Sequence, residues 1–528
     1  MRFAAFAPVL LVLAVCGPAM SAPRTIADLQ ADLAAGRTSS EKLVEFYLAR
    51  IAAIDRSGPT LQAVLTINGQ ALDAARALDA ERHANGPRGP LHGIPLLLKD
   101  NIETADPMPT TAGSLALRDN LSARDATLTA RLRAAGAIIL GKTNLSEWAN
   151  MRGSRSVSGW SGMGGLTRNP WSPDRSACGS SSGSGAAVAA GLAAGAVGTE
   201  TDGSITCPAS VNGVVGFKPT LGLVSRHNVV PLAHSQDTAG PMGHSVRDVA
   251  LMLAAMAGSD PADPATRDAD AHRQDYLAGL DPAALQGKRI GVMRFEAGFH
   301  PETDAVFAHA LDVLRQAGAT LVEIDKMPSA PDGSADTIGD AEQLVLLTEL
   351  KADLNTYLAT TPPAVQTRTL AALIAFNRAH ADRELGLFGQ ELFEKAEATK
   401  GLSDPAYLAA RATSLRLAGA DGIDRMLADG HLDALVGPTA GPAWTVDTIN
   451  GDHSSGQIST LPAVAGTPHL TLPMGLVDGL PVGLSIVGPA WSDARVLAFG
   501  YAFEQALGFI EQPGMVPVAA APALSKPF

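Results

Sequence analysis

The sequence predicts an α/β fold in which helices cover a largely buried β-sheet. The first observation is a repeated pattern, in which an amphipathic helix, a glycine turn and a short apolar strand follow one another at 126–147 and at 307–325. The second is a turn and an apolar strand that ends at Lys99 and Asp100. Strands that alternate with helices are typical of an α/β layer fold, and chains of this length occur as one large domain.

The other segments agree with this class. Residues 38–55 are predicted to form an amphipathic helix that Thr38 caps, with Glu41 reaching back in a capping box. The further expectations, in chain order, are short strands within 214–226 and 288–295, a surface connection at 258–287, a largely helical insertion at about 340–430, and a strand, turn, strand and helix over 469–507.

The composition is that of a folded, acidic protein. The 528 residues are 46% hydrophobic and 18% charged, which is far from the signature of disorder. The formal net charge of −13 argues against general nucleic-acid binding, because that requires a basic surface. We therefore expect no nucleic-acid partner.

The N-terminus has the pattern of a secretory signal peptide. Arg2 precedes an apolar stretch from Phe3 to Cys16, and small residues follow up to Ser21. Because Pro23 disfavours cleavage after Ala22, we expect residues 1–21 to be removed and residues 22–528 to be exported, to the periplasm or the medium.

Two alternatives to cleavage remain open at this N-terminus. The apolar stretch could stay as an uncleaved anchor, or Cys16 could be a lipoprotein cysteine, although Val15 is bulky for such a site. No later apolar run is long enough to span a membrane, so no stable membrane association is expected after signal removal. The two cysteines that then remain, Cys178 and Cys207, are interpreted as small buried side chains, with a single disulfide as the alternative.

Two segments carry the chemistry, one rich in serine and glycine and one that contains the single serine Ser204. The first, ACGSSSGSGAAVAAG at 177–191, leads directly into small apolar residues, which a flexible linker would not do; the second is TETDGSITCPA at 199–209. Residues 185–201, which lie between Ser180 and Ser204, are predicted to form one helix of small residues and a short turn. This arrangement would bring the two serines together.

Other motif interpretations are weaker. Ser181 centres a G-x-S-x-G sequence, but the two prolines before it are incompatible with the buried strand that a nucleophile elbow needs. Ser39 and Lys42 match S-x-x-K, yet the start of a helix accounts for both residues. No phosphate-binding loop and no His/Cys cluster with metal-ligand spacing is present, so neither metal nor cofactor is expected.

Four segments in this order resemble the amidase signature hydrolases: GIPLLLKDN, GSSSGSGAAVAAG, TDGSITCPA with GVVGFKPT, and GLPVGLSIVG. The resemblance covers about residues 25–510 and implies a single large domain with a central mixed β-sheet surrounded by helices. It also implies a Ser–cis-Ser–Lys triad, with Ser204 as nucleophile, Ser180 as bridging serine after a cis peptide bond, and Lys99 as base.

The physical logic agrees with this assignment. A serine hydroxyl is a poor nucleophile until a base takes its proton, and burial of Lys99 would favour the neutral amine that can do so. Ser181 is expected to hydrogen-bond beside the triad. Backbone N–H groups at Thr201, Asp202, Gly203 and Ser204 are expected to form the oxyanion hole.

The chain departs from the common family pattern in ways that concern specificity. Family members commonly have glycine at the positions of Cys178 and Asp202, and arginine at that of Thr206. The segment RGSRSVSGWSG at 152–162 resembles the branch that contains bacterial peptide amidases, so Ser154 is expected to contact substrate. The predicted function is therefore hydrolysis of C-terminal peptide amides to acid and ammonia.

Three alternatives to a peptide amidase remain. The chain could be an aryl or aliphatic acylamidase of the same family, acting on small-molecule amides. It could belong to the enzyme that amidates mischarged glutamyl-tRNA, which the export signal disfavours. It could also be a binding protein without activity, although all three triad positions are filled.

Overall fold

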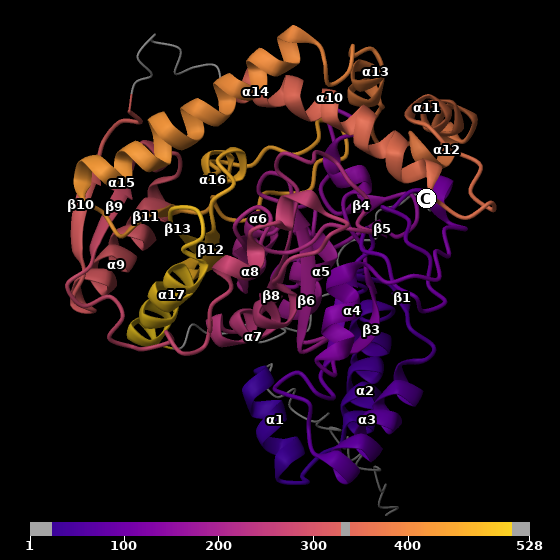
Figure 1. Ribbon diagram of the computed structural model, residues 1–528, viewed down its shortest axis with the longest axis horizontal. Coiled ribbons are helices and arrows are strands. Elements are labelled where there is room, and N and C mark those ends of the chain that lie inside the picture. Colours follow the sequence, from indigo (N-terminus) through magenta and orange to yellow (C-terminus); the bar gives the residue numbers. More distant parts are fainter. Residues whose placement is uncertain (1–23, 329–337, 509–528) are drawn as a thin grey trace, which may run out of the picture.

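The computed structural model describes residues 24–328 and 338–508, and within them an eleven-stranded sheet forms the centre (Figure 1). Its strand order is β1-β3-β2-β6-β8-β7-β12-β13-β11-β9-β10, and a separate ribbon pairs β4 with β5. The strands are β1 Val64–Ile67, β2 Pro95–Lys99, β3 Ile138–Thr143, β4 Trp160–Ser161, β5 Gly165–Leu166, β6 Gly195–Glu200, β7 Val215–Lys218, β8 Thr238–Gly243, β9 Arg289–Met293, β10 Thr320–Ile324, β11 Ala434–Pro438, β12 His469–Val477 and β13 Leu480–Val487.

The sheet is mixed, as expected. β2 pairs in parallel with both β3 and β6, and β9 does so with β10 and β11, whereas β6, β8, β7, β12 and β13 are antiparallel neighbours. The predicted signal peptide at 1–21 lies outside the described residues. No helix in the described ranges is both long and apolar enough to cross a membrane.

Helices cover both faces of this sheet. They are α1 Ile26–Ala34, α2 Ser40–Arg50, α3 Ala71–Asn85, α4 Thr127–Ala134, α5 Ser182–Ala189, α6 Thr206–Asn212, α7 Val246–Met256, α8 Ala269–His272, α9 Pro301–Gln316, α10 Ile338–Ala359, α11 Leu370–Ala379, α12 Ala381–Glu384, α13 Glu391–Glu397, α14 Pro405–Ala418, α15 Asp424–Gly430, α16 Thr460–Val464 and α17 Asp493–Leu507. One layer consists of α4, α7, α17 and α9, which contact one another in that order, and α5 and α6 pack together elsewhere on the sheet.

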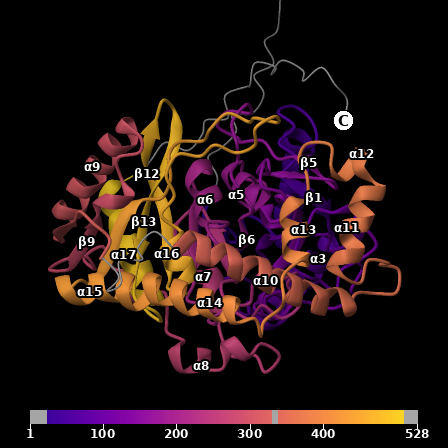
Figure 2. The same ribbon diagram turned by 90° about the horizontal axis from the view of Figure 1, so that it is seen from above.

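The helical insertion predicted near 340–430 corresponds to α10 through α15. Figures 1 and 2 show α10 and α14 running side by side, and these two helices also contact each other extensively. In Figure 1 these two helices lie above α16 and α6, and α14 contacts α16. α6 begins within the 199–209 segment.

Most predicted elements are confirmed. The 126–147 segment forms α4 and β3, the 307–325 segment falls on α9 and β10, and the 469–507 segment forms β12, β13 and α17. The predicted helix cap at Thr38 is wrong, because Ser39 is the N-cap and its hydroxyl accepts the backbone N–H of Lys42. A capping box occurs one helix earlier instead, between Thr25 and Asp28.

The segment between the two serines also differs from the prediction. After α5 the chain does not simply turn, because Gly195–Glu200 forms β6, a central strand between β2 and β8. The small residues of α5 allow close packing: a β-carbon at Gly183 would overlap the Ala63 carbonyl and lie 2.7 Å from the backbone nitrogen of Asn144. This helix is therefore buried along its whole length between the sheet and α6.

Candidate active site

Lys99 lies at the end of β2 and is fully buried. Its Nζ donates to the hydroxyl of Ser180 at 2.7 Å, and to the hydroxyl and the carbonyl oxygen of Thr199 at 2.8 and 3.1 Å. Burial lowers the pKa of Lys99 to about 7, although the negative charges of Asp237 and Glu200 act in the opposite direction. Near neutral pH this amine can therefore exchange a proton with Ser180.

Ser180 and Ser181 lie in the turn that precedes α5. The peptide bond between Gly179 and Ser180 is cis, as the family resemblance implied. The hydroxyl of Ser181 donates to the Thr199 carbonyl at 3.0 Å and accepts the Thr199 N–H at 3.2 Å, so this serine fixes the end of β6 beside Lys99.

Ser204 lies in the turn between β6 and α6 and is 7% exposed. Its carbonyl oxygen accepts the backbone N–H of Ser181 at 3.1 Å, and this bond joins the 177–191 segment to the 199–209 segment. The first N–H groups of α6, at Ile205 and Thr206, donate to the carboxylate of Glu200 at 2.7 and 2.9 Å. By contrast, the N–H groups of residues 201–204 donate to no acceptor in the part of the chain that the structure describes. These free donors are the chemistry that an oxyanion requires.

Side chains from two other segments, 236–237 and 459–460, hold this turn in place. The Thr201 hydroxyl donates to Asp237 at 2.7 Å, and the Thr201 carbonyl accepts from the Gln236 side chain at 3.2 Å. The carboxylate of Asp202 accepts from the hydroxyls of Ser459 and Thr460, which begin α16. Asp202 therefore fixes the turn with its side chain, in addition to presenting a backbone N–H.

Cys178 and Cys207 form a disulfide across the two segments, with their Cα atoms 6.0 Å apart. The interpretation of these residues as two unbridged side chains is therefore wrong, although both are buried. Spacing along the sequence could not show the pairing, because it depends on how α6 packs against the turn before α5.

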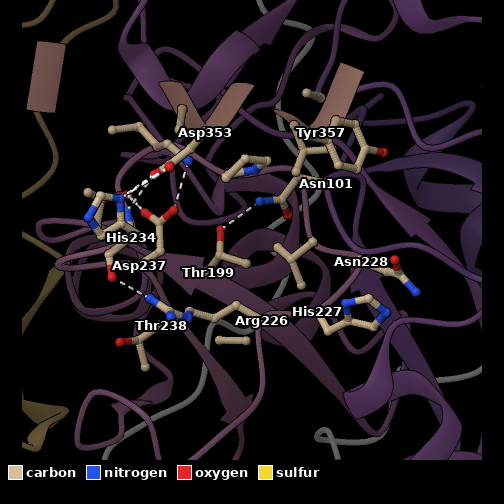
Figure 3. Close-up of a pocket in the computed structure, with 18 of the residues that line it drawn as sticks. Asn101, Thr199, Arg226, His227, Asn228, His234, Asp237, Thr238, Asp353 and Tyr357 are labelled. Carbon is tan, nitrogen blue, oxygen red and sulfur yellow. Dashed lines mark hydrogen bonds and ion pairs between the residues drawn. The ribbon is translucent and has the colours of Figure 1, made fainter. Parts of the chain in front are cut away.

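A cavity of about 380 Å³ opens beside this site (Figure 3). Thr199 and Thr201 line it on the triad side, and its other walls combine apolar side chains such as Trp148 and Leu350 with polar ones such as Asn101. Ser204 is not part of its lining, so the cavity approaches Lys99 and Ser180 from the side of Thr199. In Figure 3, Asn101 reaches toward Thr199, and its amide donates to the Thr199 hydroxyl at 2.9 Å.

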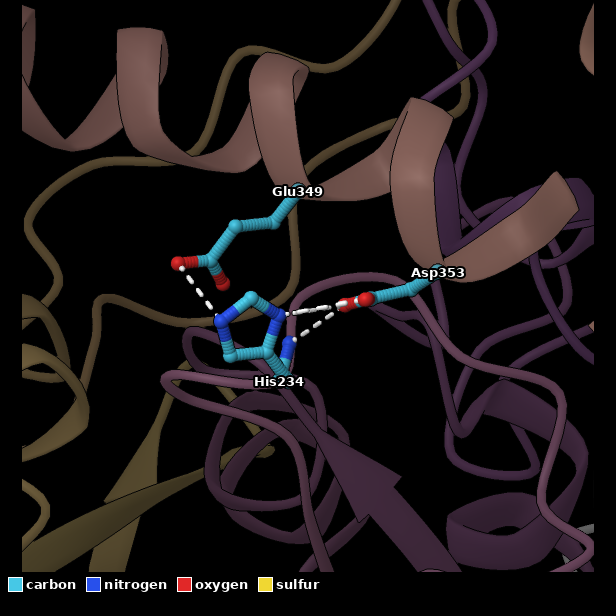
Figure 4. Close-up of side chains that lie close together, drawn as sticks. All are labelled: His234, Glu349 and Asp353. Atoms are coloured by element: carbon cyan, nitrogen blue, oxygen red, sulfur yellow. Dashed lines mark hydrogen bonds and ion pairs between the residues drawn. The ribbon is translucent and has the colours of Figure 1, made fainter. Parts of the chain in front are cut away.

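At the edge of this cavity, His234 lies between Glu349 and Asp353 of α10 (Figure 4). Its Nδ1 is 2.9 Å from Asp353 and its Nε2 is 3.4 Å from Glu349, so opposite sides of the ring face the two carboxylates. The hydrogen bond to Asp353 raises the pKa of His234, and Arg411 lies 3.6 Å from Glu349. This arrangement fits a protonated histidine in an ion-pair cluster better than it fits a metal ligand set, which needs converging lone pairs.

A family model described as amidase matches residues 42–497. The chain belongs to the amidase family. Its fold agrees, because solved members of the family superimpose on nearly the whole described chain, and the resemblance to amidase signature hydrolases is thereby confirmed.

Three relatives illustrate the range of this amidase family. The solved peptide amidase from Stenotrophomonas maltophilia is 52% identical with a TM-score of 0.84, covering 91% of this chain and 96% of that one. A probable amidase of Arabidopsis thaliana is 38% identical, covering 91% and 90%. A glutamyl-tRNA(Gln) amidotransferase component from a Synechococcus strain is also 38% identical, covering 90% and 91%. The chain is thus a hydrolase that acts on amides, and it is similar to the bacterial peptide amidase branch.

The structure brings Lys99, Ser180, Ser181 and the 201–204 turn into one site, but it places Ser154 differently. The hydroxyl and the N–H of Ser154 both donate to Glu391 at the start of α13, so these groups are already occupied. Sequence reasoning missed Thr199 and Asp237. Thr199 lies inside the TETDGS segment that was singled out, whereas Asp237 carries no local signal and is recruited only by folding.

Proposed function

We propose that this amidase hydrolyses the C-terminal carboxamide of peptides to the free acid and ammonia, through an acyl-enzyme on Ser204. The observation that carries the proposal is the buried Lys99, whose Nζ lies 2.7 Å from Ser180 Oγ in a segment that is bonded to Ser204. A buried lysine with a pKa of about 7 is suited to serve as a base at neutral pH.

In the proposed acylation step, Ser204 Oγ attacks the amide carbon as its proton passes to Ser180 Oγ, and the proton of Ser180 passes to Lys99 Nζ. The carbonyl oxygen becomes an oxyanion and accepts from the N–H groups of the 201–204 turn. The proton then returns along the same route to the amide nitrogen, and ammonia leaves. Water enters in its place, gives up a proton by the same relay, and releases the acid from Ser204.

Two observations support a peptide amide as substrate. The solved relative at 52% identity is a peptide amidase. The cavity beside Thr199 also offers apolar walls for side chains and polar groups, including Asn101, that can pair with backbone amides. A site that hydrogen-bonds its substrate in this way discriminates strongly, because an unmatched substrate leaves polar groups unpaired.

We also propose that the chain is exported and that residues 1–21 are removed. The sequence pattern at the N-terminus supports export, and so does the disulfide between Cys178 and Cys207, because such bonds persist in oxidising compartments. N-terminal sequencing of protein recovered from the periplasm or medium tests this. A soluble cytoplasmic product that retains Met1 would contradict it.

To test the substrate class, the enzyme is incubated with one peptide in four forms. These are its C-terminal amide, its anilide, its ester, and a free acid that carries Asn and Gln side chains. We expect ammonia release and conversion of –NH₂ to –OH only at the C-terminal amide, detected by mass spectrometry, with the Asn and Gln amides unchanged. Preferred cleavage of the anilide would favour the acylamidase alternative. Glutaminase activity that requires tRNA and partner proteins would favour the amidotransferase alternative, to which the 38% identity gives some weight.

A further inference from the structure

We propose that the disulfide between Cys178 and Cys207 positions the two active-site serines relative to each other, so that turnover depends on this bond. The inference rests on the proposed roles of Ser180 and Ser204. It adds two positioning residues, neither of which touches the reacting atoms.

The first argument is the location of the bond. Cys178 precedes Ser180 by two residues, and Cys207 follows Ser204 by three residues in the first turn of α6. The disulfide therefore joins the backbone just before one active-site serine to the backbone just after the other. Because both linking segments are short, a shift of α6 relative to the turn before α5 would change the relation between the two hydroxyls directly.

The second argument is the backbone conformation of Cys178. Its φ is +53°, in the left-handed region where residues with a β-carbon are disfavoured and glycine is preferred. The cysteine therefore stands against the preference of the backbone at this position. What its side chain contributes there, and a glycine could not, is the disulfide to Cys207.

The third argument is that few other bonds connect these segments. The backbone hydrogen bond from Ser181 to Ser204 is the direct link at 3.1 Å, and further along α6 the Asn212 amide donates to the Ala177 carbonyl at 3.0 Å. The disulfide itself lies in a small apolar cluster with Val211, Ala443 and Trp444, away from the main core. It therefore fixes the site locally.

General stability is a weaker explanation for the bond. The main apolar cluster extends along the sheet from α1 to α17 without either cysteine, and a chain of this size buries enough surface to fold without a disulfide. The bond is thus expected to influence the rate of reaction more than the existence of the fold.

The test compares wild type with Cys178→Gly/Cys207→Ala and with Cys178→Ser/Cys207→Ser. In the glycine variant, residue 178 no longer places a β-carbon in the left-handed region. A loss of activity that came only from lower stability would therefore be smallest in this variant. We expect kcat and the rate of acylation by a fluorophosphonate probe to fall about 10- to 100-fold in both variants, because displacement of about 1 Å between reacting groups has effects of this size. KM and the acidic limb of the pH profile should change little, since neither the cavity nor Lys99 is altered.

A matched control is Phe307→Leu in α9, which opens a small gap in the buried core of the layer that α9 forms with α17, whereas the two serines lie next to α5 and α6. It should lower Tm without lowering kcat when activity is measured well below Tm. Variants without the disulfide that keep the wild-type kcat and acylation rate would overturn the proposal, and so would a failure of both to fold, which would indicate a general structural role. If wild type hydrolyses no amide and reacts with no fluorophosphonate, the proposed function itself is wrong, which is a different outcome.

Discussion

The backbone N–H of Ser181 donates to the carbonyl oxygen of Ser204 at 3.1 Å, so the segments 177–191 and 199–209 are joined through the main chain. The same two segments are joined by the disulfide from Cys178 to Cys207. Lys99 approaches from β2 on the other side of Ser180. The site is therefore assembled from a strand end and two helix-initiating turns, and each part can be tested separately.

The first prediction is that Ser204→Ala abolishes turnover while the fold is retained. Loss of an essential nucleophile lowers kcat by about 10⁴-fold or more. The measurement is kcat on a peptide amide, together with fluorophosphonate labelling and circular dichroism. Ser181→Ala is the matched control, and we expect a milder loss from it because its hydroxyl bonds only to the backbone of Thr199. If Ser204→Ala stays active and Ser181→Ala does not, Ser181 is the nucleophile.

The second prediction concerns the pH dependence of kcat/KM. The pKa of Lys99 is lowered to about 7, so the lysine is charged below that pH and neutral above it. Only the neutral form accepts a proton, and kcat/KM should therefore rise with pH through about 7 and then level off. Lys99→Ala should lower kcat/KM by about 10²- to 10⁴-fold and remove this limb.

A second buried lysine provides the control for that experiment. Burial lowers the pKa of Lys218 to about 8, but its Nζ donates to the carbonyl oxygens of Thr467 and Pro219 and to no hydroxyl of the site. Lys218→Met should keep the acidic limb near 7. If the limb persists in Lys99→Ala and disappears in Lys218→Met, the assignment of the base is wrong.

The sequence was sufficient to predict the class of fold and to single out the segments that the structure brings together around Lys99, Ser180 and the 201–204 turn, because each of these segments has a strong local pattern. It was insufficient for β6. Gly195, Ala196 and Gly198 are too small to show strand periodicity, and at Gly198 a β-carbon would lie 2.8 Å from Ser181 Oγ. Asp237 and Ser459 were missed for a related reason. Their contacts with the 201–204 turn exist only after distant strands and helices have packed together.

The third prediction tests the 201–204 turn through Gly203→Ala. Gly203 has φ +75°, and a β-carbon there would overlap the Gln457 amide and lie 2.8 Å from Ser459 Oγ. The variant should displace the N–H groups of the turn and lower kcat by about 10²- to 10³-fold, as loss of an oxyanion donor does. Gly287→Ala is a matched control, since Gly287 has φ +70° but open space around it. Equal kcat values for the two variants would show that the turn is not used in catalysis.

The last prediction concerns a buried ion pair whose arginine also bonds to the insertion. Arg152 and Glu147 are both fully buried, with Nε and Oε1 3.0 Å apart, and the guanidinium of Arg152 also donates to the carbonyl oxygen of Glu384 in α12. Phe388 covers it, with its ring centroid 4.1 Å from the guanidinium carbon. Arg152→Met removes the cation and leaves a buried carboxylate, which should cost about 3–5 kcal/mol in the free energy of unfolding.

The protonation of Glu147 gives this prediction a second readout. Burial raises the pKa of Glu147 well above its usual value, so the folded chain binds its proton more tightly than the unfolded chain does. Stability then falls as pH rises above the unfolded pKa, and the loss in Arg152→Met should be smaller at acidic than at neutral pH. Adding Glu147→Gln should recover part of the loss and reduce its pH dependence. Denaturation of the three proteins at two pH values checks this, and an equal, pH-independent loss in the single and double variants would mean that Arg152 acts through packing on Phe388 alone.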